Sequence, residues 1–255
     1  MKKFYPLLLG SLLLLGACKF PNSIKSSEPN DSLQTRIDSA EISNDISEAP
    51  ADKAVYSKII KIDYQENQSI LNILPLLPDS SMASWGWKKE EREGMVRSLA
   101  TSNQFTDTTE NYNTIRKVTP HYFETQVVDG VWTASLYKVS ENHYIVITND
   151  MVGDGSDVNA FEVKGKQITA LSMDHLIGAD PGNLLLKNSN EACKSLLDDY
   201  GMFTYDFSDP NLISISSSYF TKKANAECFN GNEITFKFNP KIKRFDLVKT
   251  SWGKP

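Results

Sequence analysis

The sequence has little of the chemistry that marks common enzyme classes. It contains three histidines, His121, His143 and His175, which lie far apart along the chain. There is no His-Glu-x-x-His segment and no Cys-x-x-Cys pair, so the usual zinc sites have no support and we predict no metal site. The Walker A and G-x-G-x-x-G phosphate loops and the G-x-S-x-G turn of α/β-hydrolases are missing too. We therefore assign no catalytic residue, no cofactor-binding residue and no cofactor from the sequence.

The first eighteen residues carry the most specific signal in the chain. Lys2 and Lys3 precede an apolar run over Phe4–Gly16, which is short for a helix that spans a bilayer. The run ends in Leu15-Gly16-Ala17-Cys18, which resembles the lipobox of bacterial lipoprotein signal peptides. The resemblance implies cleavage before Cys18 and acylation of that cysteine. An ordinary secretory signal and an uncleaved membrane anchor are the alternatives.

The same resemblance implies a cellular location. Lipoproteins of this kind carry several acyl chains on the cysteine, which gives the stable anchoring that one chain alone does not. Lys19, rather than an aspartate, follows the cysteine, and by the enterobacterial sorting rule this favours the outer membrane. We expect a lipid-anchored protein of the bacterial cell envelope, in the outer membrane facing the periplasm, with the cell surface as the alternative.

Cysteine is scarce, and the leader accounts for one of the three. With Cys18 assigned to lipid, Cys193 and Cys228 remain as a pair in an exported, oxidising compartment, which favours a disulfide. A bridge that closes about 35 residues would stabilise the fold by roughly 3–4 kcal/mol in the chain-entropy model. Two buried free thiols are the alternative.

Basic residues are outnumbered by acidic ones. Removing Lys2 and Lys3 with the leader lowers the basic count from 27 to 25, against 32 acidic residues, so the net charge is near −7. Nucleic-acid binding needs a basic surface that displaces counterions from phosphate. We therefore expect no nucleic-acid partner.

The composition divides the chain into three parts. Residues 1–17 are the signal peptide that the lipobox resemblance implies, and residues 18–54 are expected to comprise the lipidated cysteine and a flexible tether. The tether is rich in serine and acidic residues and has one aromatic, Phe20, so it cannot bury enough apolar surface to fold. Its 36 residues would span roughly 30–35 Å. Residues 55–255 are predicted to form a single globular domain.

Within that domain, alternating apolar and polar residues predict an α+β fold with predominantly antiparallel sheet and two short helices. The helices are expected at Lys88–Thr101 and between Asn188, as the cap, and Gly201, as the stop. Whether the strands form one sheet or two is left open. The predicted strands are Val55–Asp63, His121–Val128, Val131–Lys138, His143–Asn149, Val158–Lys164, Gln167–Leu171, Phe203–Phe207, Leu212–Ser218, Glu233–Asn239 and Arg244–Ser251.

Two segments invite a functional interpretation. Trp85 and Trp87 could stack on a ligand, but tryptophans at a helix start are more often part of the core. The acidic loop Asn149–Glu162 contains Asp150, Asp154 and Asp157, which suit calcium. Aligned with the EF-hand pattern, however, it places apolar residues at ligand positions, so we interpret it as a solvated hairpin loop.

Anchor, tether and sheet together favour a non-enzymatic domain that binds an envelope protein or a cell-wall component. An inhibitor or immunity-type protein is one specific version, since an anchored acidic domain suits a basic target. An envelope hydrolase acting on peptidoglycan, glycan or peptide is an alternative, because a Ser-His-Asp site needs no local motif. A structural or assembly accessory lipoprotein is the third hypothesis.

Overall fold

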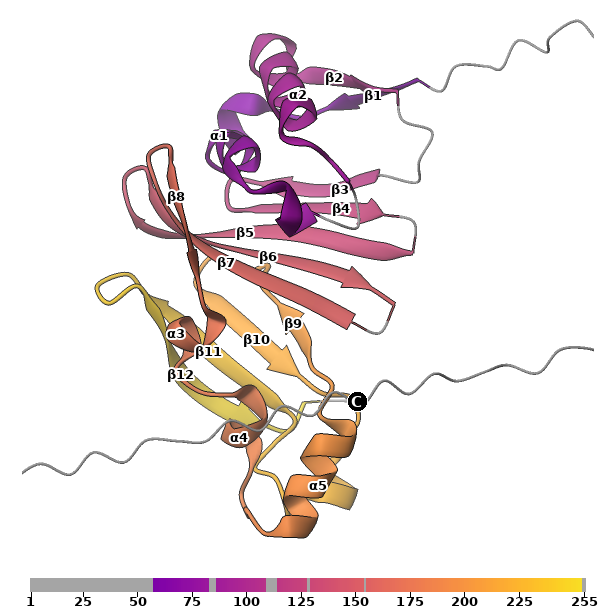
Figure 1. Ribbon diagram of the computed structural model, residues 1–255, viewed down its shortest axis with the longest axis vertical. Coiled ribbons are helices and arrows are strands. Elements are labelled where there is room, and N and C mark those ends of the chain that lie inside the picture. Colours follow the sequence, from indigo (N-terminus) through magenta and orange to yellow (C-terminus); the bar gives the residue numbers. More distant parts are fainter. Residues whose placement is uncertain (1–56, 83–85, 109–113, 128, 154, 254–255) are drawn as a thin grey trace, which may run out of the picture. The chain divides into compact units, whose positions relative to one another are not determined.

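The computed structural model describes residues 57–82, 86–108, 114–127, 129–153 and 155–253. They form the predicted α+β fold, in which antiparallel strands predominate (Figure 1). The described strands form three sheets, of two, six and four strands. The leader, Cys18, the tether and the predicted domain boundary near residue 55 lie outside the described residues and stay predictions. No helix among the described residues is long and apolar enough to cross a membrane.

The six-stranded sheet is a meander in which each strand pairs with the next one along the chain. The sequence predicts five of its strands. The sixth, β3, was missed because the charged pair Arg116 and Lys117 and a register shift between Ile115 and Lys117 interrupt its alternation. In chain order the strands are β3 (Thr114–Thr119), β4 (Tyr122–Val127), β5 (Gly130–Ser140), β6 (His143–Val152), β7 (Gly155–Lys164) and β8 (Gln167–Leu171).

The C-terminal segment forms the four-stranded sheet, in the order β12-β11-β10-β9. All four strands were predicted, and the β11–β12 hairpin closes with Lys243 in the left-handed region at φ 56°. The two-stranded sheet pairs the predicted first strand with one the sequence did not indicate. The strands are β9 (Thr204–Asp206), β10 (Leu212–Ser216), β11 (Glu233–Asn239), β12 (Arg244–Ser251), and the pair β1 (Lys58–Lys61) and β2 (Gln104–Asp107).

The two predicted helices are present, as α2 (Lys89–Ser102) and α5 (Glu191–Tyr200). The cap of α5 is Asn190 rather than Asn188, because the Asn190 side chain accepts the Cys193 N–H at 2.8 Å. The sequence predicted too few helices. Further helical segments are α1 (Tyr64–Ile73), α3 (Met173–Ile177), α4 (Pro181–Leu185), α6 (Lys222–Asn225) and the 3-10 turns η1 (Leu74–Leu76) and η2 (Asp79–Met82).

Helix α1 was not predicted, because Pro75 interrupts the apolar run Ile70–Leu77 and proline disfavours a helix interior. The helix begins at a cap, where Asp63 accepts the Glu66 N–H at 3.1 Å. Pro75 lies in the first turn of η1, where its missing N–H costs no hydrogen bond. Ile70 and Leu71 are fully buried, so burial of the inner face holds the helix in place.

The two faces of the six-stranded sheet pack against different layers. Phe123 and Trp132 belong to the core shared with α1 and α2. Tyr137 and Ile145, on the opposite face, belong to the core shared with the four-stranded sheet. Each layer therefore buries one side of the meander, as the alternation of its strands requires.

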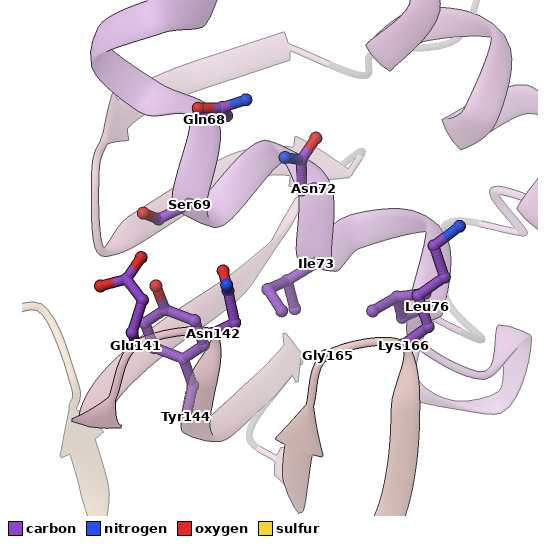
Figure 2. Close-up of a pocket in the computed structure, with 10 residues that line it drawn as sticks. All are labelled: Gln68, Ser69, Asn72, Ile73, Leu76, Glu141, Asn142, Tyr144, Gly165 and Lys166. Atoms are coloured by element: carbon purple, nitrogen blue, oxygen red, sulfur yellow. The ribbon is translucent and has the colours of Figure 1, made fainter.

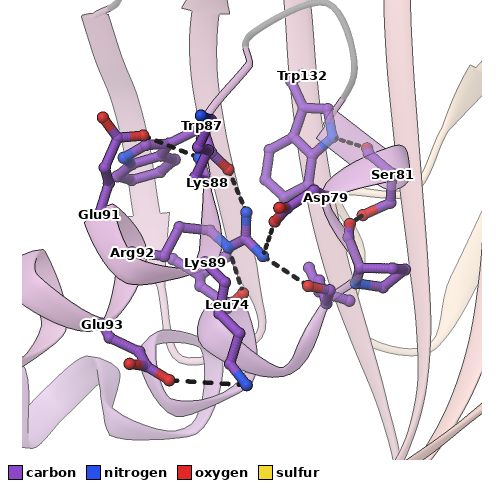
Figure 3. Close-up of polar contacts among 12 residues, drawn as sticks. Leu74, Asp79, Ser81, Trp87, Lys88, Lys89, Glu91, Arg92, Glu93 and Trp132 are labelled. Atoms are coloured by element: carbon purple, nitrogen blue, oxygen red, sulfur yellow. Dashed lines mark hydrogen bonds and ion pairs between the residues drawn. The ribbon is translucent and has the colours of Figure 1, made fainter.

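A buried arginine organises the first layer (Figure 3). Arg92 of α2 is fully buried. Its Nε donates to the carbonyl of Leu74 at 2.9 Å, one terminal nitrogen donates to that of Leu77 at 2.6 Å, and the other donates to that of Trp87. Asp79 supplies the counter-charge at 3.0 Å. The guanidinium thus connects α2 to the η1 turn, to Leu77 directly after that turn and to Trp87 before α2.

The second layer contains the disulfide. Cys193 and Cys228 are bonded as predicted, with an S–S distance of 1.97 Å. Cys193 is 2% exposed, so it faces the interior. The bridge connects α5 to the segment that leads into β11.

Candidate functional site

A hollow of about 540 Å³ lies between α1 and two neighbouring hairpin turns (Figure 2). One wall is the outer face of α1. The other is formed by the β5–β6 turn, at Glu141 and Asn142, and the β7–β8 turn, at Gly165 and Lys166. We call this the large hollow. Its size is in the range of small-ligand sites.

The two turns that form its lower wall are fixed by backbone geometry. Asn142 has φ 53° and Gly165 has φ 60°, the left-handed region that asparagine and glycine tolerate best. The Gly165 N–H donates to the Asn142 carbonyl at 2.8 Å. This bond joins one turn to the other, so the wall of the hollow is formed before any ligand binds.

Polar groups gather at one end of the large hollow. Figure 2 shows Glu141, Asn142 and the Tyr144 side chain below Ser69 of α1. Glu141 is paired with Lys138 at 3.2 Å, and both side chains are well exposed. The net charge at this end is therefore small, and the amide and the hydroxyl groups dominate its hydrogen-bonding chemistry.

The other end of the large hollow is apolar. Ile73 of α1 and Leu76 of η1 lie above Gly165 and the side chain of Lys166 (Figure 2). Ile73 is only 4% exposed, so it belongs mainly to the core. The hollow thus offers a polar end and a small apolar end to one ligand.

A second hollow, of about 260 Å³, adjoins the first. Both are lined by Ser69 and Tyr144, so the two meet at these side chains. The far wall includes His121 and Asn211 together with prolines that precede or follow strands. We call this the small hollow, and the pair the Tyr144 groove. The groove was not predicted from the sequence, since its walls come from segments far apart in the chain.

The histidines of the described chain do not converge. His121 faces the Ser208 carbonyl at 3.1 Å, whereas His143 contacts Glu162 at 2.7 Å. No group of three or more His, Cys, Asp or Glu side chains with metal-binding geometry occurs in the part of the chain that the structure describes.

Glu162 forms a small ionic cluster between the sheets. Its Oε1 contacts Lys243 of the β11–β12 turn and His143 of β6, each at 2.7 Å. Hydrogen bonds from Lys243 and then from His143 lower the pKa of the Glu162 carboxyl. The cluster connects the two larger sheets and is structural in character.

The two segments singled out in the sequence have ordinary roles where they are described. Trp87 is half-buried and lies against Phe123, with ring centroids 6.2 Å apart, so its core interpretation is confirmed. Trp85 lies outside the described residues.

The interpretation of Asn149–Glu162 as a solvated loop was wrong, because most of this segment forms the paired strands β6 and β7. Asp150 faces Asp157 across the two strands, and Asn149 and Asp150 are buried. Asp154 lies outside the described residues.

One motif that the sequence reasoning missed is the spacing Ser135-x-x-Lys138, which occurs in some serine acyl-enzymes. Both residues lie in β5, where residues three apart point to opposite faces. Ser135 is 1% exposed, and Lys138 borders the Tyr144 groove. The strand therefore separates the hydroxyl from the amine.

Comparison with known proteins gives no family. No protein-family model and no curated protein matches the chain. Among solved structures, the chain is similar to a domain of an uncharacterized protein from Porphyromonas gingivalis W83. The similarity covers 71% of this chain and 98% of that domain, at 10% identity and a TM-score of 0.47.

Proposed function

We propose that the protein is a lipid-anchored protein of the bacterial cell envelope that binds an envelope component in the Tyr144 groove. The observation that carries the proposal is the preformed groove itself. Its wall is fixed by the Gly165–Asn142 hydrogen bond, and amide, hydroxyl and aromatic groups line it. Such a lining is suited to hydrogen-bonding a ligand with little reorganisation.

The leader supports the location. Acylation of Cys18 would hold the protein at the membrane, and the tether of residues 18–54 would let the domain reach roughly 30–35 Å from it. Lys19 favours outer-membrane delivery facing the periplasm. From there the domain could reach either an envelope protein or a cell-wall component, and the groove is proposed as the contact point.

The anchor is tested by replacing Cys18 with serine in the full-length protein. We expect Cys18→Ser to leave the membrane pellet and to lose labelling by a clickable palmitate analogue. Lys19→Ser is the control and should stay with the membrane. A Cys18→Ser variant that still sediments with membranes would contradict the anchor.

The groove is tested by capture from envelope extract with the tagged full-length protein. Tyr144→Ala should lose the captured component, since it removes the ring shared by both hollows. Tyr219→Ala is the matched control, because Tyr219 is half-exposed and lies outside the groove. Equal capture by both variants would refute the groove as the contact point, and turnover of a wall substrate would favour the hydrolase alternative.

A further inference from the structure

We infer that the ligand of the Tyr144 groove is an uncharged saccharide chain that crosses Tyr144 and places sugar units in both hollows. This inference rests on the proposed function and adds the chemical class of the ligand. It is argued from three features of the groove: its mixed lining, its low net charge, and its position over turns rather than along a strand edge.

The lining matches the surface of a sugar ring. A sugar presents hydroxyl groups around its edge and C–H groups on its faces. The large hollow offers the Asn142 amide and the Ser69 hydroxyl near one end and Ile73 and Leu76 near the other. An amide both donates and accepts, so it can pair with a hydroxyl in either orientation.

Tyr144 lies where a chain would pass from one hollow to the other. It borders both hollows and is partly packed against the core, which restricts its ring. An aromatic face held in this way provides a flat apolar surface with a polar hydroxyl at its edge. Asn211 on the far side adds an amide for the next unit.

The charges favour an uncharged chain. Lys138 and Glu141 neutralise each other beside the groove, which leaves Lys166 as the one unbalanced charge among the described residues of its lining, and the whole chain carries more acidic than basic residues. A strongly acidic polymer would meet a repulsive field from the protein as a whole. A neutral chain is not affected by this field.

A peptide strand fits the groove less well. Extended peptides gain affinity by pairing with the free backbone groups of a sheet edge. Here the wall is made of hairpin turns, and the Gly165 N–H and the Asn142 carbonyl bond to each other. The side chains, rather than a backbone ladder, are left to recognise the ligand.

The test uses the full-length protein in detergent and neutral oligosaccharides of one to six units, made of N-acetylglucosamine, glucose or mannose. Binding is followed by calorimetry and by shifts of the Asn and Gln amide NMR signals. We expect one series to bind, with an affinity that rises about tenfold or more from one unit to three or four and then levels off. No binding by any series at about 10 mM, or binding without dependence on length, would overturn the inference.

Two variants separate the hollows. Asn142→Gly removes the amide of the large hollow while keeping a residue that suits φ 53°, and it should weaken oligomers of every length about 3- to 10-fold. Asn211→Ala should weaken the longer oligomers by a similar factor and leave the single sugar unchanged. Tyr219→Ala should change neither, and equal effects of Asn211→Ala on all lengths would contradict a chain that spans both hollows.

The outcomes distinguish this inference from the proposed function. If Tyr144→Ala abolishes capture from envelope extract but no oligosaccharide binds, the groove is a contact point and the saccharide assignment is wrong. If neither the extract nor the oligosaccharides depend on Tyr144, both proposals fail.

Discussion

The layers on the two faces of the six-stranded sheet are fastened in different ways. On one face, a single buried guanidinium joins α2 to the carbonyls of Leu74, Leu77 and Trp87. On the other, the covalent Cys193–Cys228 bridge joins α5 to the segment before β11. One sheet thus carries a layer secured by hydrogen bonds and a layer secured by a disulfide.

The Arg92 hydrogen bonds and the Cys193–Cys228 disulfide act on different states of the chain. Removing the guanidinium takes its hydrogen bonds away from buried carbonyls in the folded protein, so the cost appears in the native state. Removing the disulfide mainly frees the unfolded chain and leaves the native contacts of α5 intact. The first layer should therefore be sensitive to one side chain, and the second to the redox state.

The largest effect is expected from Arg92→Met, which keeps an unbranched apolar stem and removes every donor. It should lower the free energy of unfolding by about 3–5 kcal/mol, because three hydrogen bonds from a buried charged group are lost. The ion pair with Asp79 adds little to this, since the Asp79 side chain is 57% exposed. Urea denaturation measures the change, with Arg97→Ala on the exposed side of α2 as the control, expected within about 0.5 kcal/mol of the native protein.

Arg92→Lys sharpens this result. A lysine carries the charge but cannot place donors in the planar fork that reaches Leu74, Leu77 and Trp87 together. We expect it to recover less than half of the stability lost in Arg92→Met. Full recovery by lysine would show that charge, rather than the geometry of the fork, secures this layer.

Next in size is the double replacement Cys193→Ser with Cys228→Ser, which should cost roughly 3–4 kcal/mol. The bridge closes only residues 193–228, so the chain that it restrains is the one released when the second layer unfolds. Amide exchange should therefore speed up in α5 while α2 keeps its protection. Reducing agent should reproduce the effect in the native protein and should have no effect on the double variant. Equal loss of protection in α2 and α5 would show that the two layers unfold as one unit, and would break the comparison.

The pattern of side chains sufficed to predict most of the sheet and the disulfide. The residues of β5 and β11 alternate between apolar and polar types along the sequence, which predicts strands, although the structure buries both faces of β5 over most of its length. The disulfide between Cys193 and Cys228 was predicted because these two cysteines remain once Cys18 is assigned to the lipobox. By contrast, α1 was missed because Pro75 argues against a helix in this segment. In the structure Pro75 lies in the first turn of η1, directly after α1, where it is tolerated, and the sequence alone does not show that this turn forms.

The groove could not be predicted because no local pattern encodes it. Gly165 signals a turn, but its contact with Asn142 depends on two hairpins ending at the same height. Ser69 reaches the same place only because α1 packs its other face on the sheet. Such sites arise from strand lengths and helix packing, which a single sequence does not state.

The smallest effect concerns Glu162, whose contact with Lys243 connects the six-stranded sheet to the four-stranded one at 2.7 Å. Lys243 and His143 lower the pKa of Glu162 in the folded protein. Its contribution is therefore present above the unfolded pKa of about 4.3 and is lost as the pH falls through the lower folded value. We expect Glu162→Gln to cost about 1 kcal/mol at neutral pH.

That cost should shrink towards zero once the pH falls below the lowered folded pKa of Glu162, because the native carboxyl is then protonated as well. Denaturation curves recorded from acidic to neutral pH measure the gap between the native protein and the variant. Glu141→Gln is the control, since its side chain is 80% exposed and its pairing with Lys138 should contribute little at any pH. A gap in the free energy of unfolding that stays constant with pH would mean that Glu162 stabilises the contact between the two sheets by packing rather than by its charge. The disulfide would then act in the second layer without an added ionic contact between the sheets.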